Sequence, residues 1–149
     1  MLSLKSVRDQ LVQLLHLQES PQRTALAFAL GVFIAFAPHY GFHMVSVVFC
    51  AWAFRLNYLA LFMGAFLNNP WTFAPILGLT LYTGFTVFGI SPTSTFDVTN
   101  LHLENLYESL APYLIPFILG GCLLGLVGAL LAYPIMLFVI HRYRSGKSQ

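Results

Sequence analysis

The sequence predicts an all-α integral membrane protein, and three observations support this fold class. Hydrophobic residues make up 58% of the 149-residue chain and charged residues only 8%, whereas a soluble domain carries roughly 25% charged residues. The mean hydropathy is +0.75. Residues 24–54, 56–96 and 109–141 contain no Lys, Arg, Asp or Glu. Each of these runs exceeds the roughly 20 residues that a helix needs to cross a bilayer.

Residues 1–22 are expected to form an amphipathic helix at the membrane surface. Leu4, Val7, Leu11 and Leu14 recur at helical spacing, with charged and amide side chains between them. Because charged residues interrupt this apolar stripe, we do not expect a cleavable signal peptide here.

The membrane domain is expected over residues 23–141, and its first run is interrupted at its middle. Ser20-Pro21 is a typical helix start. Pro38 and Gly41 break the run, because proline lacks a backbone donor and glycine adopts dihedrals that other residues avoid. Each half is too short to cross a bilayer alone. The run is therefore either one kinked crossing or a re-entrant helical hairpin.

The next run, residues 56–90, repeats this arrangement and is expected to form a broken transmembrane helix. Its break contains Asn68, Asn69, Pro70 and Thr72. Two interrupted apolar segments in tandem are typical of membrane proteins whose helices break inside the bilayer.

Small residues at helical spacing predict close helix packing in the first and last runs. In lipid, helices associate through packing, and small side chains let their backbones approach. The expected packing positions are Ala27, Gly31, Ala35, Gly121, Gly125 and Gly128.

The ends of the chain are basic and its one internal polar loop is acidic. Residues 91–108 are expected to form that loop, residues 109–140 the C-terminal transmembrane helix, and residues 142–149 a basic tail. The positive-inside rule puts both termini in the cytoplasm and the loop outside.

The same rule favours the re-entrant hairpin. If residues 24–54 enter and leave by one face, Arg23 and Arg55 both lie on the cytoplasmic side, together with both termini. Four crossings, with a turn near Pro75, would also satisfy the charges.

Broken helices in corresponding positions indicate midplane substrate sites in transporters. The expected substrate-binding residues are His39, His43, Arg55, Asn57, Asn68, Asn69 and Thr72. Imidazoles, a guanidinium and half-helix N-termini suit an anionic, phosphate-bearing group. Alternatively, Asn69 and Thr72 cap the broken helices, and Arg55 anchors in lipid headgroups.

The sequence shows no pattern typical of an enzyme, of a metal or cofactor site, or of a nucleic-acid-binding protein. No Ser-His-Asp pattern, phosphate loop or paired carboxylates appear, so we do not expect an enzyme. Gly41 separates His39 from His43, and Cys50 and Cys122 have no metal or redox spacing, so no metal or cofactor is expected. The net charge of +2 is too small to suggest nucleic-acid binding. The expected partners are membrane lipids and further copies of the chain.

The same residues resemble a known family. Ser20-Pro21, the segment 29–35 with Pro38 and Gly41, the joint 55–57 and the segment 69–72 resemble the bacterial membrane proteins grouped as domain of unknown function 2062. The family motif residues here would be Gly31, Phe33, Pro38, Gly41, Asn57, Asn69, Pro70 and Thr72. The resemblance covers roughly residues 20–140 and implies a multi-pass protein of the bacterial inner membrane without a known activity.

A fainter similarity is to the DedA-type membrane proteins, which are associated with moving lipid carriers. The chain lacks the acidic and arginine residues expected within their hairpins. Two functions are therefore expected: a small transporter or lipid translocase, or a non-transporting scaffold whose helix breaks are packing devices.

Overall fold

The computed structural model describes residues 19–38, 41–89 and 106–145, and within these ranges the chain is all-helical without a strand. The helices there are α2 (Pro21–Phe36), α3 (His43–Phe54), α4 (Tyr58–Ala65), α5 (Phe73–Val87) and α6 (Leu106–Ser145). The amphipathic helix expected over residues 1–22 lies almost wholly outside the described residues, as does most of the loop expected over residues 91–108.

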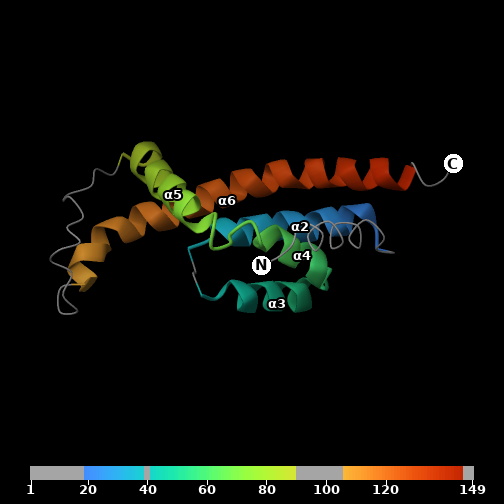
Figure 1. Ribbon diagram of the computed structural model, residues 1–149, viewed down its shortest axis with the longest axis horizontal. Coiled ribbons are helices and arrows are strands. Elements are labelled where there is room, and N and C mark those ends of the chain that lie inside the picture. The colour runs from blue at the N-terminus through green and yellow to red at the C-terminus, as the bar shows by residue number, and fades with distance from the viewer. Residues whose placement is uncertain (1–18, 39–40, 90–105, 146–149) are drawn as a thin grey trace.

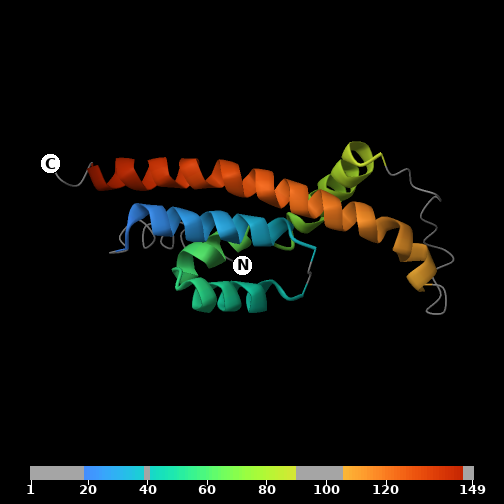
Figure 2. The same ribbon diagram turned by 180° about the vertical axis from the view of Figure 1, so that it is seen from behind.

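The helix α2 lies at the centre of the molecule, between α6 on one side and α4 on the other (Figures 1 and 2). It begins as the sequence predicts, with Pro21 at the first position and the Ser20 hydroxyl accepting from the Arg23 N–H at 3.4 Å. It ends at Phe36 because Ala37 precedes Pro38 and is extended. The chain then turns, with Gly41 at φ +91°, and α3 runs back antiparallel to α2.

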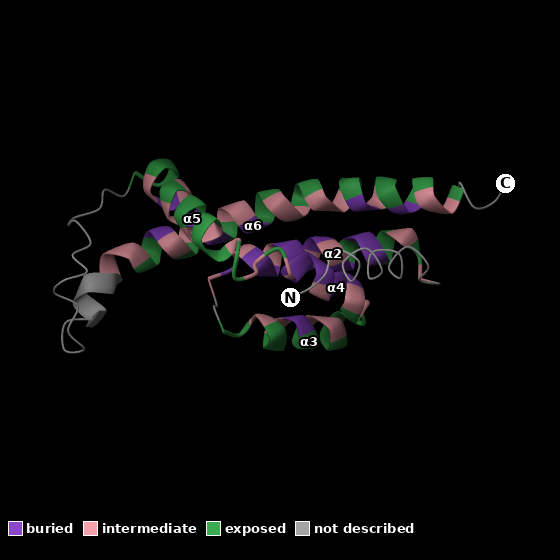
Figure 3. Ribbon diagram, viewed as in Figure 1, coloured by how far each residue is buried: buried purple, intermediate pink, exposed green. Residues whose placement is uncertain are grey.

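One of the two closest crossings joins α2 to α4, which run parallel. Gly31 and Gly64 face each other's helix so closely that a Cβ on Gly31 would clash with the Leu61 carbonyl, and one on Gly64 with the Phe28 carbonyl. Ala27 is fully buried on the same side of α2. Figure 3 shows that buried residues concentrate along α2 and α4.

The long helix α6 packs antiparallel to α2 along its C-terminal half. A Cβ on Gly121 would lie 2.6 Å from the Phe36 carbonyl oxygen, and one on Gly128 3.2 Å from a Val32 methyl. Gly125 faces Phe33 between them.

The N-terminal half of α6 packs antiparallel to α5. A Cβ on Gly84 would clash with the Pro116 carbonyl, and one on Gly120 with the Thr80 carbonyl. The rings of Phe85 and Tyr113 meet edge to face at 5.9 Å.

The membrane segments that follow the first hairpin can be compared with the sequence-based expectation. Residues 56–90 form two helices, α4 and α5, on either side of the expected break, and the two have different neighbours: α4 packs with α2 and α3 whereas α5 packs with α6. The last helix is longer than residues 109–140: it begins at Leu106 and continues through the basic residues to Ser145. Within the described residues, the start of the expected basic tail is therefore the last turn of α6.

One helix segment in the described part of the chain, Ala111–Ser145, is long and apolar enough to cross a membrane. The mean hydropathy of its most apolar window is 2.5, and only 17% of that window is buried. The helices α2, α3 and α5 are apolar but shorter. The outer face of α3 exposes large side chains, among them Phe49 and Trp52.

Candidate functional site

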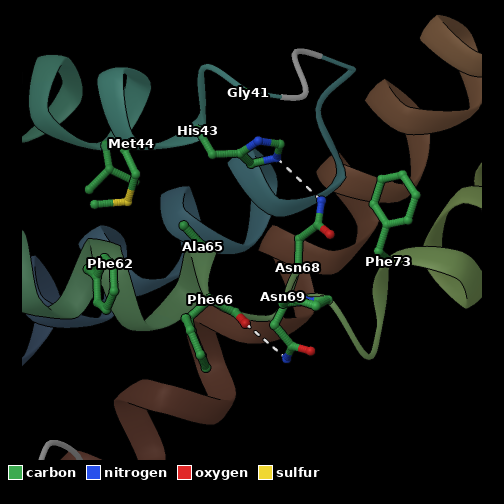
Figure 4. A pocket seen from close by; sticks show the side chains of 11 residues that line it. Gly41, His43, Met44, Phe62, Ala65, Phe66, Asn68, Asn69 and Phe73 are labelled. Carbon is green, nitrogen blue, oxygen red and sulfur yellow. Dashed lines mark hydrogen bonds between the residues drawn. The ribbon is translucent and has the colours of Figure 1, made fainter. Parts of the chain in front are cut away.

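The two helix breaks open onto one cavity of about 390 Å³. Gly41 and His43 reach it from the first break, and Asn68 and Asn69 from the second (Figure 4). Phe73, the first residue of α5, lines it as well. Segments about 25 positions apart in the sequence therefore share one site.

Asn68 joins the two breaks within this cavity. Its Nδ2 donates to the Ala35 carbonyl at 2.9 Å and lies 3.4 Å from Nε2 of His43. Because an amide NH₂ only donates, this contact is a hydrogen bond in the tautomer that carries no proton on Nε2 of His43. The Asn68 side chain thus ties the end of α2 to the start of α3.

The N-terminus of α3 also faces this cavity. His43 and Met44, its first two residues, line the wall, and Phe42 at the N-cap position makes no side-chain cap bond. The N–H groups of a helix first turn carry partial positive charge and favour anions. The cavity therefore combines an amide, an imidazole and a helix N-terminus, and its described lining contains no carboxylate.

The side chains of Asn69, which lines the cavity, and of Thr72 bond backbone groups of their own break. Oδ1 of Asn69 accepts from the N–H groups of Trp71 at 2.9 Å and Thr72 at 3.2 Å. Oγ1 of Thr72 accepts from the Asn69 N–H at 2.9 Å and donates to the Leu67 carbonyl. These bonds close the turn that precedes α5; Thr72 is the N-cap residue of that helix, and its side chain forms no cap bond to the first turn.

Arg55 and Asn57 lie at the other end of α3 from His43. Because α3 has 12 residues, it separates its two ends by about 18 Å. Asn57 caps α4, accepting from the Ala60 N–H at 3.1 Å. Arg55 ends α3 in the left-handed region, at φ 51°, and its carbonyl accepts from Nη2 of Arg23 at 2.7 Å. The expected site therefore divides, and Arg55 and Asn57 do not belong to the cavity.

The remaining predicted residues are distributed as follows. His39 lies outside the described residues. Pro70 lines the cavity, whereas a Cβ on Gly121 would lie 3.6 Å from Cδ of Pro38, which places Pro38 against α6. In the described ranges, no group of three or more His, Cys, Asp or Glu side chains comes together.

The apolar wall of the cavity was not predicted. Phe62 and Phe66 lie four residues apart on α4, with ring centroids 5.9 Å apart, and both line the cavity. Their spacing puts them on one helix face. In a chain with so many aromatic residues, however, such spacing does not single out a site.

A family model described as "Uncharacterized protein conserved in bacteria (DUF2062)" matches residues 4–149. The chain belongs to this family. The match extends the resemblance seen over residues 20–140 to nearly the whole sequence. No curated protein and no solved structure matches the chain.

Proposed function

We propose that this chain is a multi-pass protein of the bacterial inner membrane that carries an anionic, phosphate-bearing solute or lipid headgroup across it. The observation that carries the proposal is the meeting of two helix breaks at one cavity lined by His43 and Asn68. Several transporters build their substrate sites where the ends of broken helices meet.

The distribution of charge and exposure supports the membrane placement. The segment Ala111–Ser145 is long enough to cross, and the outer faces of the other helices are apolar. The start of α2, the α3–α4 joint and the end of α6 lie toward one end of the molecule (Figures 1 and 2). Arg23, Arg55 and Arg142 belong to these segments, so one basic end faces the cytoplasm and α2–α3 is a re-entrant hairpin.

The cavity would bind its substrate through donors. A phosphate oxygen entering it would accept from the N-terminal N–H groups of α3. Phe62, Phe66 and Phe73 would keep the binding site apolar around these donors.

A second function is favoured by a specific observation. The polar side-chain atoms of Asn69 and Thr72 are used within their own turn. That turn therefore serves to position the start of α5. Such a structural role for a helix break is expected of a non-transporting scaffold or assembly partner. In the first function, the protein moves a substrate that binds in the cavity of His43 and Asn68. In the second function, it moves none.

Proteoliposomes separate the two functions. The probes are radiolabelled inorganic phosphate and a fluorescent phosphatidylglycerol. Asn68→Asp is nearly isosteric but places a carboxylate in the cavity, so we expect it to reduce movement of the active probe at least tenfold. Gln22→Glu adds the same charge at an exposed position of α2 and should leave movement unchanged.

Folding is checked for each variant by its unfolding temperature in detergent. If the folded parent protein moves neither probe, or if folded Asn68→Asp moves them as the parent does, the transport function is wrong. The scaffold function would then stand.

A further inference from the structure

Two apolar hollows lie side by side on α2, away from the cavity at the breaks. The first, of about 500 Å³, lies between α2 and α6, and Phe33 and Leu130 belong to its walls. The second, of about 390 Å³, lies between α2 and the α3–α4 joint, where Phe54 lines it. Leu26 and Leu30 line both hollows. The two leucines therefore form a ridge with one hollow on each flank.

Arg23 stands at the rim of the second hollow, one turn before Leu26. Nη2 of its guanidinium donates to the Arg55 carbonyl at 2.7 Å, and its other N–H groups bond no described residue. The exposed Arg55 guanidinium also forms no hydrogen bond with a described residue.

No described carboxylate neutralises this charge. Glu19 is the closest in sequence, but it forms no ion pair with either arginine, and its Oε2 is buried without a hydrogen-bond partner. In the described part of the chain, Arg23 and Arg55 thus form no ion pair at the head of a paired apolar groove.

We propose that this surface binds one anionic phospholipid with two acyl chains. Its phosphate bonds the free side of the Arg23 guanidinium, whose fork of donors matches phosphate oxygens. One acyl chain lies in each hollow, on either side of Leu26 and Leu30. We assign two acyl chains because there are two hollows. We assign an anionic headgroup because no described carboxylate pairs with Arg23 or Arg55.

This site is distinct from the proposed transport cavity. It lies at the opposite end of α3, at the basic end of the molecule, where the cytoplasmic leaflet supplies anionic lipids. It rests on the membrane part of the proposed function and not on transport. A second copy of the chain is the other possible occupant, but an apolar helix face would leave the charge of Arg23 unmatched.

Native mass spectrometry of the detergent-purified full chain tests the proposal. The protein is offered phosphatidylglycerol or phosphatidylcholine with the same acyl chains, one-chain lysophosphatidylglycerol, and inorganic phosphate. We expect one phosphatidylglycerol to be retained per chain. The phosphatidylcholine and the one-chain lipid should each be retained at least about fivefold less, and phosphate should not displace the bound lipid.

Matched variants locate the site. Arg23→Gln should lose the preference for phosphatidylglycerol about fivefold, whereas Arg23→Lys retains most of it. Arg142→Gln removes the same charge from an exposed position of α6 and should change nothing. Ala129→Phe fills the first hollow, which Ala129 lines, and should release the lipid, unlike Leu131→Phe on the exposed side of α6.

Several results would overturn the assignment. The headgroup assignment is wrong if both lipids are retained equally, or if Arg23→Gln and Arg142→Gln have equal effects in folded protein. Release of the lipid by phosphate would also contradict it. A lipid-free dimer that Ala129→Phe dissociates would show that a second copy of the chain occupies the hollows. A chain extracted without detergent would refute the membrane placement itself. A chain that needs detergent but does not discriminate between headgroups refutes only the lipid site.

Discussion

At the level of single residues, four glycines form the two closest helix crossings. Gly31 and Gly64 bring α2 onto α4, and Gly84 and Gly120 bring α5 onto α6. At each position an added Cβ would meet backbone of the neighbouring helix rather than a flexible side chain. Neither helix of a pair can relieve such a clash without moving as a whole.

We therefore expect Gly31→Ala to destabilise the protein by about 1–3 kcal/mol, the usual effect of overpacking a filled interface. Gly78→Ala is the matched control, because Gly78 is helical and nothing lies within 4 Å of an added Cβ there. The control should be neutral or slightly stabilising, since alanine favours helix. Unfolding temperatures in detergent measure both. Equal temperatures for the two variants would contradict the role of the crossing.

At the level of elements, the breaks between helices are made by different means. Pro38 and Gly41 end α2 and turn the chain through the backbone preferences of proline and glycine. The second break instead depends on side chains, because Asn69 and Thr72 satisfy the backbone around the start of α5. Each of the two side chains accepts from the backbone N–H of the other residue, so the two residues stabilise the turn together.

We expect Asn69→Ala and Thr72→Val each to destabilise the fold by about 1–3 kcal/mol through unsatisfied backbone groups. The double variant should lose less than the sum of the two, because both side chains belong to one network. Thr86→Val is the control: its hydroxyl is exposed and bonds its own helix at the Tyr82 carbonyl. Chemical unfolding of the four variants gives the coupling. Strict additivity would show that the two residues act independently.

The helix starts and breaks were predictable from the sequence because their causes are local. Ser20-Pro21 and Pro38 mark both ends of α2 without reference to any other helix. The division of the candidate site was harder to see. Polar residues at 55–57 and at 68–72 look alike in the sequence. The two groups nevertheless lie at opposite ends of the helix α4. Of these two groups of polar residues, the second brings Asn68 to within 3.4 Å of Nε2 of His43.

At the level of the whole molecule, the chain consists of two packing groups on one long helix. The helices α2, α3 and α4 form one group, which contacts α6 through α2, and α5 packs on the other half of α6. Helix partners of this kind depend on contacts distant in sequence. Gly64 as the partner of Gly31, and α5 as the partner of α6, were for that reason not predicted.

The proposed topology predicts which positions face the same side of the membrane. In a background of Cys50→Ala and Cys122→Ala, single cysteines at positions 55 and 142 should react with an impermeant thiol reagent only from the cytoplasmic side. A cysteine at position 97 should react only from the outside, since it lies in the acidic segment. Labelling is compared between intact cells and inverted membrane vesicles. Labelling of position 55 from outside would refute the re-entrant hairpin.

The reciprocal contact of Gly31 with Gly64 also limits how the chain can acquire compensating changes. When two side chains meet, enlarging one is often rescued by shrinking the other. Here each glycine faces the opposite backbone, and no residue is smaller than glycine. A suppressor screen begun from Gly31→Ala should therefore return no revertant at position 64. Second-site rescue would have to come from substitutions elsewhere that stabilise the fold globally.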